Sequence, residues 1–179
     1  MLTILRSLQR LVGLFEDKNI PYMIIGGYAL PFYGRIRTTI DLDLAVGIKT
    51  EDELTQFHYW LRLIDFEATV YSPLNPVIVV LDQKEKVEIE LWRKPDGIVF
   101  DDETLRRRRK VKMDNIEVWI VSPEDFIVNK LARPDRGAID EQDVKSVLVR
   151  QENKLDEEYL KKRAKEAEVL TILEHIRTA

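Results

Sequence analysis

Asp41 and Asp43 stand one residue apart in the segment 39–46, where apolar and polar residues alternate. This alternation has the period of a half-buried strand, so both carboxylates are expected on the same face. Two acids so close together repel each other, and a divalent cation between them removes that cost. Oxygen ligands on an open face suit Mg²⁺ (or Mn²⁺), which shares its remaining positions with waters and phosphate oxygens. The pair therefore predicts metal-assisted chemistry on a phosphate compound.

A glycine pair, Gly26 and Gly27, follows the apolar run 22–25. After a buried strand, such a pair lets the backbone turn tightly, and the amides of the following short helix can bind phosphate. Alone it would be only a turn, because it lacks the lysine and hydroxyl residue of a P-loop and the third glycine of a dinucleotide fold. With the aspartates it predicts transfer of a nucleotidyl group, in which two metals stabilise charge on the attacking and leaving oxygens.

The alternative for Asp41 and Asp43 is an ordinary strand with a solvated acidic face. Aspartate is depleted in strands, and two on one face without a metal or a basic partner would be unfavourable. A calcium loop fits poorly, because Ala45 and Val46 stand where further oxygen ligands and a turn glycine are needed. The sequence therefore favours the metal site.

The order of these motifs resembles the signature of the nucleotidyltransferase superfamily, which has the polymerase-beta-like fold. The glycine pair is followed, after 13 intervening residues, by Asp-Leu-Asp-Leu, and Arg37 and Thr39 precede the aspartates at alternate positions. This arrangement is most similar to compact bacterial and archaeal members: minimal, antibiotic and type IV toxin-class nucleotidyltransferases. The resemblance covers about residues 20–150. It implies a nucleoside triphosphate substrate, with Arg37 or Thr39 orienting the strand or contacting phosphate.

The family places a third carboxylate on a later strand, in an apolar-acid-apolar setting. The segment 87–91 offers two candidates, Glu88 and Glu90, on one strand face. Glu88 is preferred as the third metal ligand and as the catalytic carboxylate that polarises the acceptor hydroxyl. Glu90 is close behind, because alternation alone cannot choose between the two. The alternative, that both lie on the solvent face of a hairpin strand and pair with Lys84 or Lys86, stays open.

The segment 122–131, followed by Arg133 and Asp143, is similar to a helix of the toxin-like and minimal members. The resemblance implies that Lys130 contacts the triphosphate and that Asp143 supports it or assists proton transfer. Lys130 could equally be a surface lysine on an amphipathic helix. For Asp143, which lies among other charged residues, the sequence favours a solvated position.

Periodicity predicts the elements that position these residues. Helices are expected over 3–17, 28–33, from 50 to about 64, from 122, over 139–150 and over 156–177. Strands are expected over 22–25, 39–46, 76–81, 86–92 and 116–121. This order predicts an α+β fold with a mixed β-sheet flanked by helices and a helical C-terminal part. A nucleotidyltransferase-like domain is expected over 1–150, with a C-terminal helix over 151–179 packed on it or extending it.

Composition narrows the function. The chain has 179 residues, no cysteine and a net charge of -4, so disulfides, thiolate metal sites and an overall basic field are excluded. The basic run 106–110 follows acidic residues and has no interleaved aromatics, so a solvated connection is favoured over an RNA-binding patch. Trp60, Trp92 and Trp119 are expected in the core. No run approaches the roughly 18 apolar residues of a membrane span, and a cytoplasmic location is expected.

The sequence thus predicts a metal-dependent enzyme that transfers a nucleoside monophosphate from a nucleoside triphosphate to a hydroxyl of a protein, RNA or small molecule. The rival is a non-catalytic relative that binds a nucleotide or a partner protein, for example as one component of a toxin–antitoxin pair. Both need the same pocket, so the sequence discriminates poorly between them.

Overall fold

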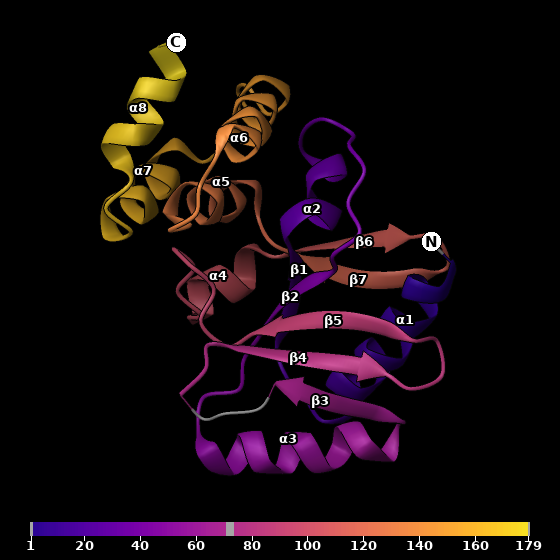
Figure 1. Ribbon diagram of the computed structural model, residues 1–179. Coiled ribbons are helices and arrows are strands. Elements are labelled where there is room, and N and C mark those ends of the chain that lie inside the picture. The colour runs from indigo at the N-terminus through magenta and orange to yellow at the C-terminus, as the bar shows by residue number, and fades with distance from the viewer. Residues whose placement is uncertain (1, 71–73, 179) are drawn as a thin grey trace.

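The computed structural model of the chain describes residues 2–70 and 74–178. A seven-stranded sheet with the strand order β3-β4-β5-β2-β1-β7-β6 forms its centre (Figure 1). The pairs β1–β7 and β2–β5 are parallel and the other four neighbouring pairs are antiparallel, so the sheet is mixed, as the sequence predicts. The strands are β1 (Tyr22–Ile25), β2 (Asp43–Val46), β3 (Phe66–Val70), β4 (Val77–Asp82), β5 (Val87–Trp92), β6 (Arg109–Met113) and β7 (Ile116–Ile120).

Helices α1 and α3 lie beside the sheet, whereas α5 to α8 gather at one end of the molecule, at the upper left of Figure 1. The expected α+β class with a helical C-terminal part is therefore confirmed. None of the described helices combines the length and apolar composition needed to cross a membrane. The helices are α1 (Leu2–Asp17), α2 (Gly26–Ala29), the short 3-10 helix η1 (Leu30–Phe32), α3 (Glu51–Leu63), α4 (Asp102–Arg107), α5 (Pro123–Ala132), α6 (Ala138–Arg150), α7 (Glu157–Glu166) and α8 (Leu170–Thr178).

The core fixes the middle of the sheet. All four residues of β1 are buried, because β1 lies between β2 and β7 and is covered on both faces. From α1 the apolar stripe contributes Phe15, whose ring lies 5.1 Å from that of Tyr22 and 6.0 Å from that of Phe57. This packing fixes the N-terminal end of β1, and the buried residues that follow lead directly to the glycine turn after Ile25.

Local signals set two of the helix starts. Thr50 and Glu53 form a reciprocal capping box at the start of α3. Ser122 accepts a hydrogen bond from the Asp125 amide at the start of α5, with Pro123 at the first helical position. Both starts are where the sequence predicts them, and the second one orients the helix that carries Lys130.

The predicted strand over 39–46 is wrong in its first half, because β2 begins only at Asp43. The partner strand β1 ends at Ile25, opposite Asp43, so residues 39–42 have no ladder on that side. On the other side, the Glu90 amide donates a hydrogen bond to the Leu42 carbonyl (3.1 Å). Ile40, expected on the buried face, is 81% exposed. The alternation of apolar and polar residues therefore begins in the sequence before the point where strand pairing starts.

The single helix predicted over 156–177 is two helices, α7 and α8. Glu168, between them, has a positive φ of 59°, and the Val169 amide donates to the Ala164 carbonyl (2.8 Å). This is a Schellman-type termination with glutamate in place of the usual glycine. The apolar stripe runs on through the break, which is why periodicity alone does not reveal it.

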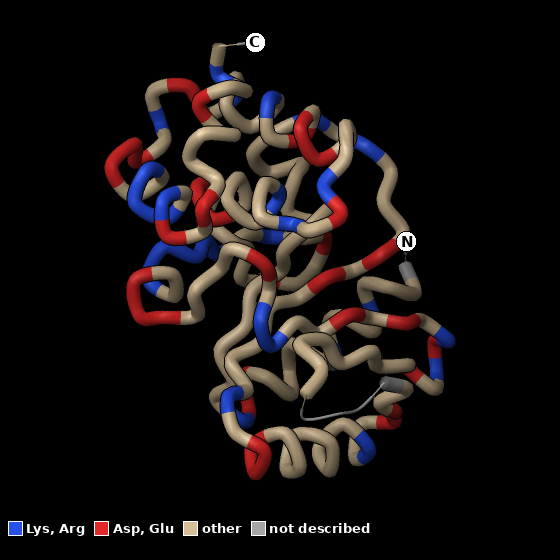
Figure 2. The backbone as a smooth tube through the Cα atoms, turned by 60° about the vertical axis from the view of Figure 1, so that its left-hand side comes forward, with Lys and Arg blue, Asp and Glu red and all other residues tan. Residues whose placement is uncertain are grey.

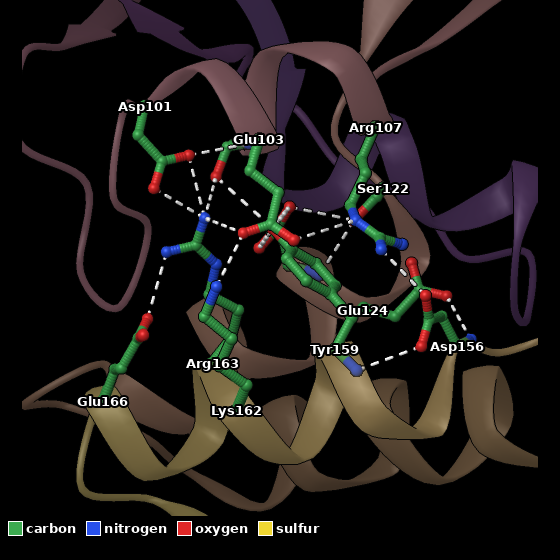
Figure 3. Close-up of polar contacts among 12 residues, drawn as sticks. Asp101, Glu103, Arg107, Ser122, Glu124, Asp156, Tyr159, Lys162, Arg163 and Glu166 are labelled. Atoms are coloured by element: carbon green, nitrogen blue, oxygen red, sulfur yellow. Dashed lines mark hydrogen bonds and ion pairs between the residues drawn. The ribbon is translucent and has the colours of Figure 1, made fainter.

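Three elements were not predicted: β3, α4 and β6. The basic run 106–110, expected to be a connection, instead spans the end of α4 and the start of the edge strand β6. Arg107 packs over the Tyr159 ring (3.8 Å) and pairs with Asp156 (2.8 Å), and Arg108 packs over the Trp119 ring (4.8 Å). The Arg107 contacts, shown in Figure 3, anchor α7 to α4, and the Arg108 contact joins the end of α4 to β7.

Candidate active site

A cavity of about 200 Å³ opens where β1 ends and β2 begins. The sheet contributes its acidic wall, and α5 with the segment before α4 contributes the opposite wall. The sheet side consists of Ile25, Gly26, Asp41, Asp43, Glu90 and Trp92, and the other side of Pro95, Asp96, Asn129, Lys130 and Arg133.

Asp43 and Glu90 lie side by side, because they are paired residues of the parallel strands β2 and β5. Their carboxyl groups hydrogen-bond each other, and the indole N–H of Trp92 donates to Asp43 Oδ1 (3.4 Å). Burial raises the pKa of Asp43, and the charge of Asp41 adds to this effect. Burial and the neighbouring charge of Asp43 likewise raise the pKa of Glu90. The cavity wall thus concentrates negative charge where both acids are partly withdrawn from water.

The two glutamates predicted as alternatives are placed differently. Glu90 lines the cavity, whereas Glu88 is exposed and does not. Both lie on one face of β5, but β2 begins at Asp43, opposite Glu90, so Glu88 is beyond the pairing. The geometry therefore brings Glu90, and not the preferred Glu88, together with the aspartate pair.

The glycine turn is shaped by the residues it faces. Gly26 has a positive φ of 64°, and a Cβ there would lie 2.4 Å from Asp43 Oδ2. A Cβ at Gly27 would lie 2.6 Å from Thr39 Oγ1. Glycine is needed at both positions so that the turn can pass directly behind the acidic wall.

Lys130 faces the acidic wall from α5 and is only 3% exposed. Its ammonium group pairs with Asp140 (2.9 Å) and lies 3.8 Å from Asp143. Arg133, one helical turn later, also lines the cavity and lies 3.7 Å from Asp140. A buried lysine held in place by carboxylates is positioned to meet an anion in the cavity.

Asp143 is fully buried, so its expected solvated position is wrong. It pairs with Arg35 (2.8 Å) and with Arg37 (3.1 Å), as well as lying near Lys130. The reason is that the loop before β2 folds back onto α6 and brings both arginines to this carboxylate. Asp143, Arg37 and Thr39 do not line the acidic cavity, and Gly27 does not line it either.

Six further lining residues were not predicted as site residues: Ile25, Trp92, Pro95, Asp96, Asn129 and Arg133. Trp92 was expected in the core but is only partly buried, and it shares the strand face of Glu90 two residues away. The Asn129 side chain donates to the Asp96 carbonyl (2.8 Å), which fixes the segment after β5 against α5. The strand period could have identified Trp92, whereas Asp96 has no signal in the sequence. Trp60 and Trp119 are also only partly buried and pack against the core.

The donor set suits a hard divalent cation. No group of three or more His, Cys, Asp or Glu side chains in residues 2–70 and 74–178 is arranged as a metal-ligand cluster. However, Asp43 and Glu90 touch each other through their carboxyl oxygens, and Asp41 acts on both electrostatically. Carboxylate oxygens beside an open cavity are the ligands Mg²⁺ prefers. The residues present therefore fit Mg²⁺ in chemistry, and Asp41, Asp43 and Glu90 are those that would hold it.

Comparison with known protein families places this site in context. Residues 4–178 match a family model described as nucleotidyl transferase of unknown function (DUF2204). Among curated protein sequences, none matches the chain significantly.

Several solved structures share the fold. The antibiotic-resistance factor ANT(2'')-Ia, in complex with adenylyl-2''-tobramycin, is 13% identical, with a TM-score of 0.57 and 99% of each chain covered. The lincosamide antibiotic adenylyltransferase LnuA, lincomycin-bound, is 15% identical, with a TM-score of 0.52 over 79% of this chain and 94% of its own. An antigenic nucleotidyltransferase-like protein from Paracoccidioides brasiliensis is 19% identical, with a TM-score of 0.56 over 99% and 92%.

Proposed function

The chain belongs to the nucleotidyl transferase family whose model it matches over residues 4–178, and from this premise we propose that it transfers a nucleoside monophosphate from a nucleoside triphosphate to a hydroxyl of a small molecule, with Mg²⁺ (or Mn²⁺) as cofactor. The observation that carries the proposal is the contact between Asp43 and Glu90 in a cavity faced by Lys130. Two adjoining acids opposite a buried cation match the needs of a metal-bound triphosphate.

The chain's own residues would bind the triphosphate from two sides. Lys130 on α5 and Arg133 directly after it offer positive charge to the phosphates, and the backbone at Gly26 allows close approach from the sheet side. Asp143 keeps Arg37 and Lys130 in place and acts as a positioning residue.

The reaction is an in-line displacement at the α-phosphorus. The acceptor oxygen forms a bond to that phosphorus, the bond from phosphorus to the bridging oxygen breaks, and pyrophosphate leaves with the electron pair. Glu90, beside Asp43, is placed to take the proton of the acceptor hydroxyl. Bound Mg²⁺, held by Asp41, Asp43 and Glu90, would stabilise the charge that develops on the attacking and leaving oxygens.

The fold neighbours favour a small-molecule acceptor, because one is described with an adenylylated tobramycin and another as a lincosamide adenylyltransferase. A non-catalytic protein that binds a nucleotide or a toxin–antitoxin partner is the second candidate. It would use the same cavity, and the raised charge density at Asp43 and Glu90 would serve binding only.

The test is incubation with each α-labelled nucleoside triphosphate, Mg²⁺ or Mn²⁺, and a fractionated cell extract. A labelled product that forms with the wild type and is lost in Asp43→Ala supports transfer. Glu90→Gln should lose the product as well, whereas Glu88→Gln should keep it. Triphosphate binding without a labelled product in any fraction would favour the non-catalytic candidate.

A further inference from the structure

A second, larger cavity adjoins the acidic one. It has a volume of about 750 Å³ and lies between the start of α1, the η1 segment and the tip of the β6–β7 hairpin. Its walls are mainly apolar and include Leu5, Tyr28, Phe32, Val87 and Met113. A cavity of this size and character is typical of a binding site for a small organic molecule.

Two chain segments contribute consecutive residues to the two cavities. In the glycine turn, Gly26 lines the acidic cavity and Gly27 lines the apolar one. In the extended segment before β2, Asp41 lines the acidic cavity and Ile40 the apolar one. The apolar cavity therefore lies beside the two segments that contribute Gly26 and Asp41 to the acidic cavity.

Tyr28 gives independent evidence of this proximity. Its ring lines the apolar cavity, and the pKa of its hydroxyl is raised by burial and by the negative charge of Asp41. The field of the acidic wall therefore reaches into the apolar cavity at this point. A hydroxyl group of a bound molecule would enter the same field.

Exposed apolar side chains mark the entrance. Ile40 is 81% exposed and Phe32 is 38% exposed, and both line this cavity. Large apolar side chains that face solvent around a concave surface indicate a ligand that covers them.

Charge argues against a polyionic occupant. The cavity has one basic and one acidic residue in its lining, Arg37 and Asp114, and Arg37 is already paired with Asp143. Elsewhere acidic and basic positions are interspersed along the backbone (Figure 2). A nucleic acid needs a row of free cations, and a polyamine needs a row of free anions; this cavity offers neither.

We propose that the apolar cavity binds the acceptor, and that the acceptor is an uncharged small molecule with an apolar body and a hydroxyl group that reaches the acidic wall. This inference rests on the proposed function, because it names the substrate class of the same site. The acceptor oxygen bonds to the α-phosphorus, its proton passes to Glu90, and pyrophosphate departs. The products are the phosphodiester of the acceptor and one pyrophosphate.

Binding can be tested without turnover through the methionine methyl groups. Met113 lines the apolar cavity, whereas Met23 is fully buried in β1 and serves as an internal control. Protein labelled with ¹³C at the methionine methyls would be titrated with 4-phenyl-1-butanol, and Met113→Leu would assign the signal. We expect a saturable shift of the Met113 signal with no shift of Met23, and no shift of either with the polycation tobramycin.

Two variants test whether the cavity wall is responsible. Phe32→Ala should weaken the binding of 4-phenyl-1-butanol at least fivefold, and Val87→Thr, which keeps the volume but adds a hydroxyl, should weaken it by a smaller factor. Leu63→Ala is the matched control, because Leu63 is 64% exposed on α3 and does not line this cavity. If Phe32→Ala and Leu63→Ala fold equally well, an unchanged affinity of Phe32→Ala for 4-phenyl-1-butanol would overturn the proposal.

Transfer is the second readout. With an α-labelled triphosphate and Mg²⁺, the wild type should form the 4-phenylbutyl ester of the nucleoside monophosphate, and Phe32→Ala should raise KM for the alcohol with little effect on triphosphate affinity. Asp43→Ala should lose the product but keep the Met113 shift. Label on tobramycin or a macromolecule, and none on the alcohol, would overturn the acceptor class. Absence of transfer to any acceptor, with the Met113 shift intact, would instead count against the proposed function.

Discussion

Asp43 and Asp125 are both aspartates whose pKa is raised chiefly by burial, yet their neighbours differ. Asp125 accepts hydrogen bonds from the hydroxyls of Ser122 and Tyr159, each at 3.0 Å, within the network that joins α4, α5 and α7 (Figure 3). Asp43 instead faces an open cavity, with another carboxyl group as its neighbour. Burial alone therefore does not mark a functional acid.

Asp125 and Asp43 also differ in the positive charge that surrounds them. Around Asp125, Arg163 is 3% exposed and binds Asp101 (2.7 Å) and Glu166 (3.0 Å), so positive charge is already supplied. At Asp43 the cation is across the cavity, on Lys130, and that lysine is held by Asp140. An acid whose surroundings leave negative charge in excess is the one suited to bind a cationic ligand.

The largest difference between the two acids should be in catalysis. Asp43→Asn keeps the shape of the side chain and removes its charge, so we expect transfer to fall on the order of 10²–10³-fold or more, with the fold retained. Asp125→Asn, the matched change in the structural network, should leave transfer within about twofold. Measuring kcat/KM of both variants checks the comparison, and equal losses would show that the two acids do not differ in role.

The second difference concerns pH. The pKa of Asp125 is about 6 in the folded protein and 3.8 ordinarily, so between these values the folded state holds a proton that the unfolded state has lost. The folded state is therefore penalised as pH rises from about 4, and the penalty levels off above pH 6 at about 3 kcal/mol. Asp125→Asn removes the titration. Its free energy of unfolding minus that of the wild type should increase from pH 4 to pH 7.

Chemical denaturation at several pH values measures this difference, because contributions from other groups cancel between the two proteins. A difference that stayed flat, or that decreased toward pH 7, would show that the Asp125 carboxyl is stabilised in its charged form by Tyr159 and Arg163.

The third difference is the response to Mg²⁺. A ligand that binds only the folded state stabilises it by about 2.7 kcal/mol at 100 times its dissociation constant. We expect Mg²⁺ with a triphosphate to raise the Tm of the wild type and of Asp125→Asn equally, and to leave Asp41→Ala/Asp43→Ala unchanged. A Tm increase in that double variant would place the metal elsewhere.

How far these roles could be predicted from the sequence depends on the range of the signal. Local signals sufficed for the glycine turn and the capped start of α5, since each involves a few adjacent residues. For the aspartate pair they sufficed only in part, because Asp41 lies before the strand that begins at Asp43. The choice between Glu88 and Glu90 could not be made, because it depends on strand register with β2. The burial of Asp143 was missed for a similar reason: its partners Arg35 and Arg37 are more than 100 residues away in sequence.

The tertiary partners of Asp125 could not be predicted from the sequence either. The sequence predicts a helix from 122, which is correct, and Asp125 belongs to the acidic first turn of that helix. Asp125 accepts hydrogen bonds from Tyr159 on α7. This helix packs on α5 through contacts that periodicity does not encode. Whether an acid is structural or functional is thus decided by tertiary partners.

The smallest expected effect concerns the hydrogen bond from Tyr159 to Asp125. Tyr159→Phe removes the hydroxyl that donates to both Asp125 oxygens and leaves Ser122 as the remaining hydroxyl donor, so it should destabilise the fold by about 1–2 kcal/mol. In the Asp125→Asn background the same change should have a smaller effect, because the acceptor is then neutral. Denaturation of the four proteins gives the coupling energy, and triphosphate affinity should be the same in all of them. A coupling near zero would mean that Tyr159 stabilises α7 through its ring against Arg107, and that the hydrogen bond to Asp125 contributes nothing measurable.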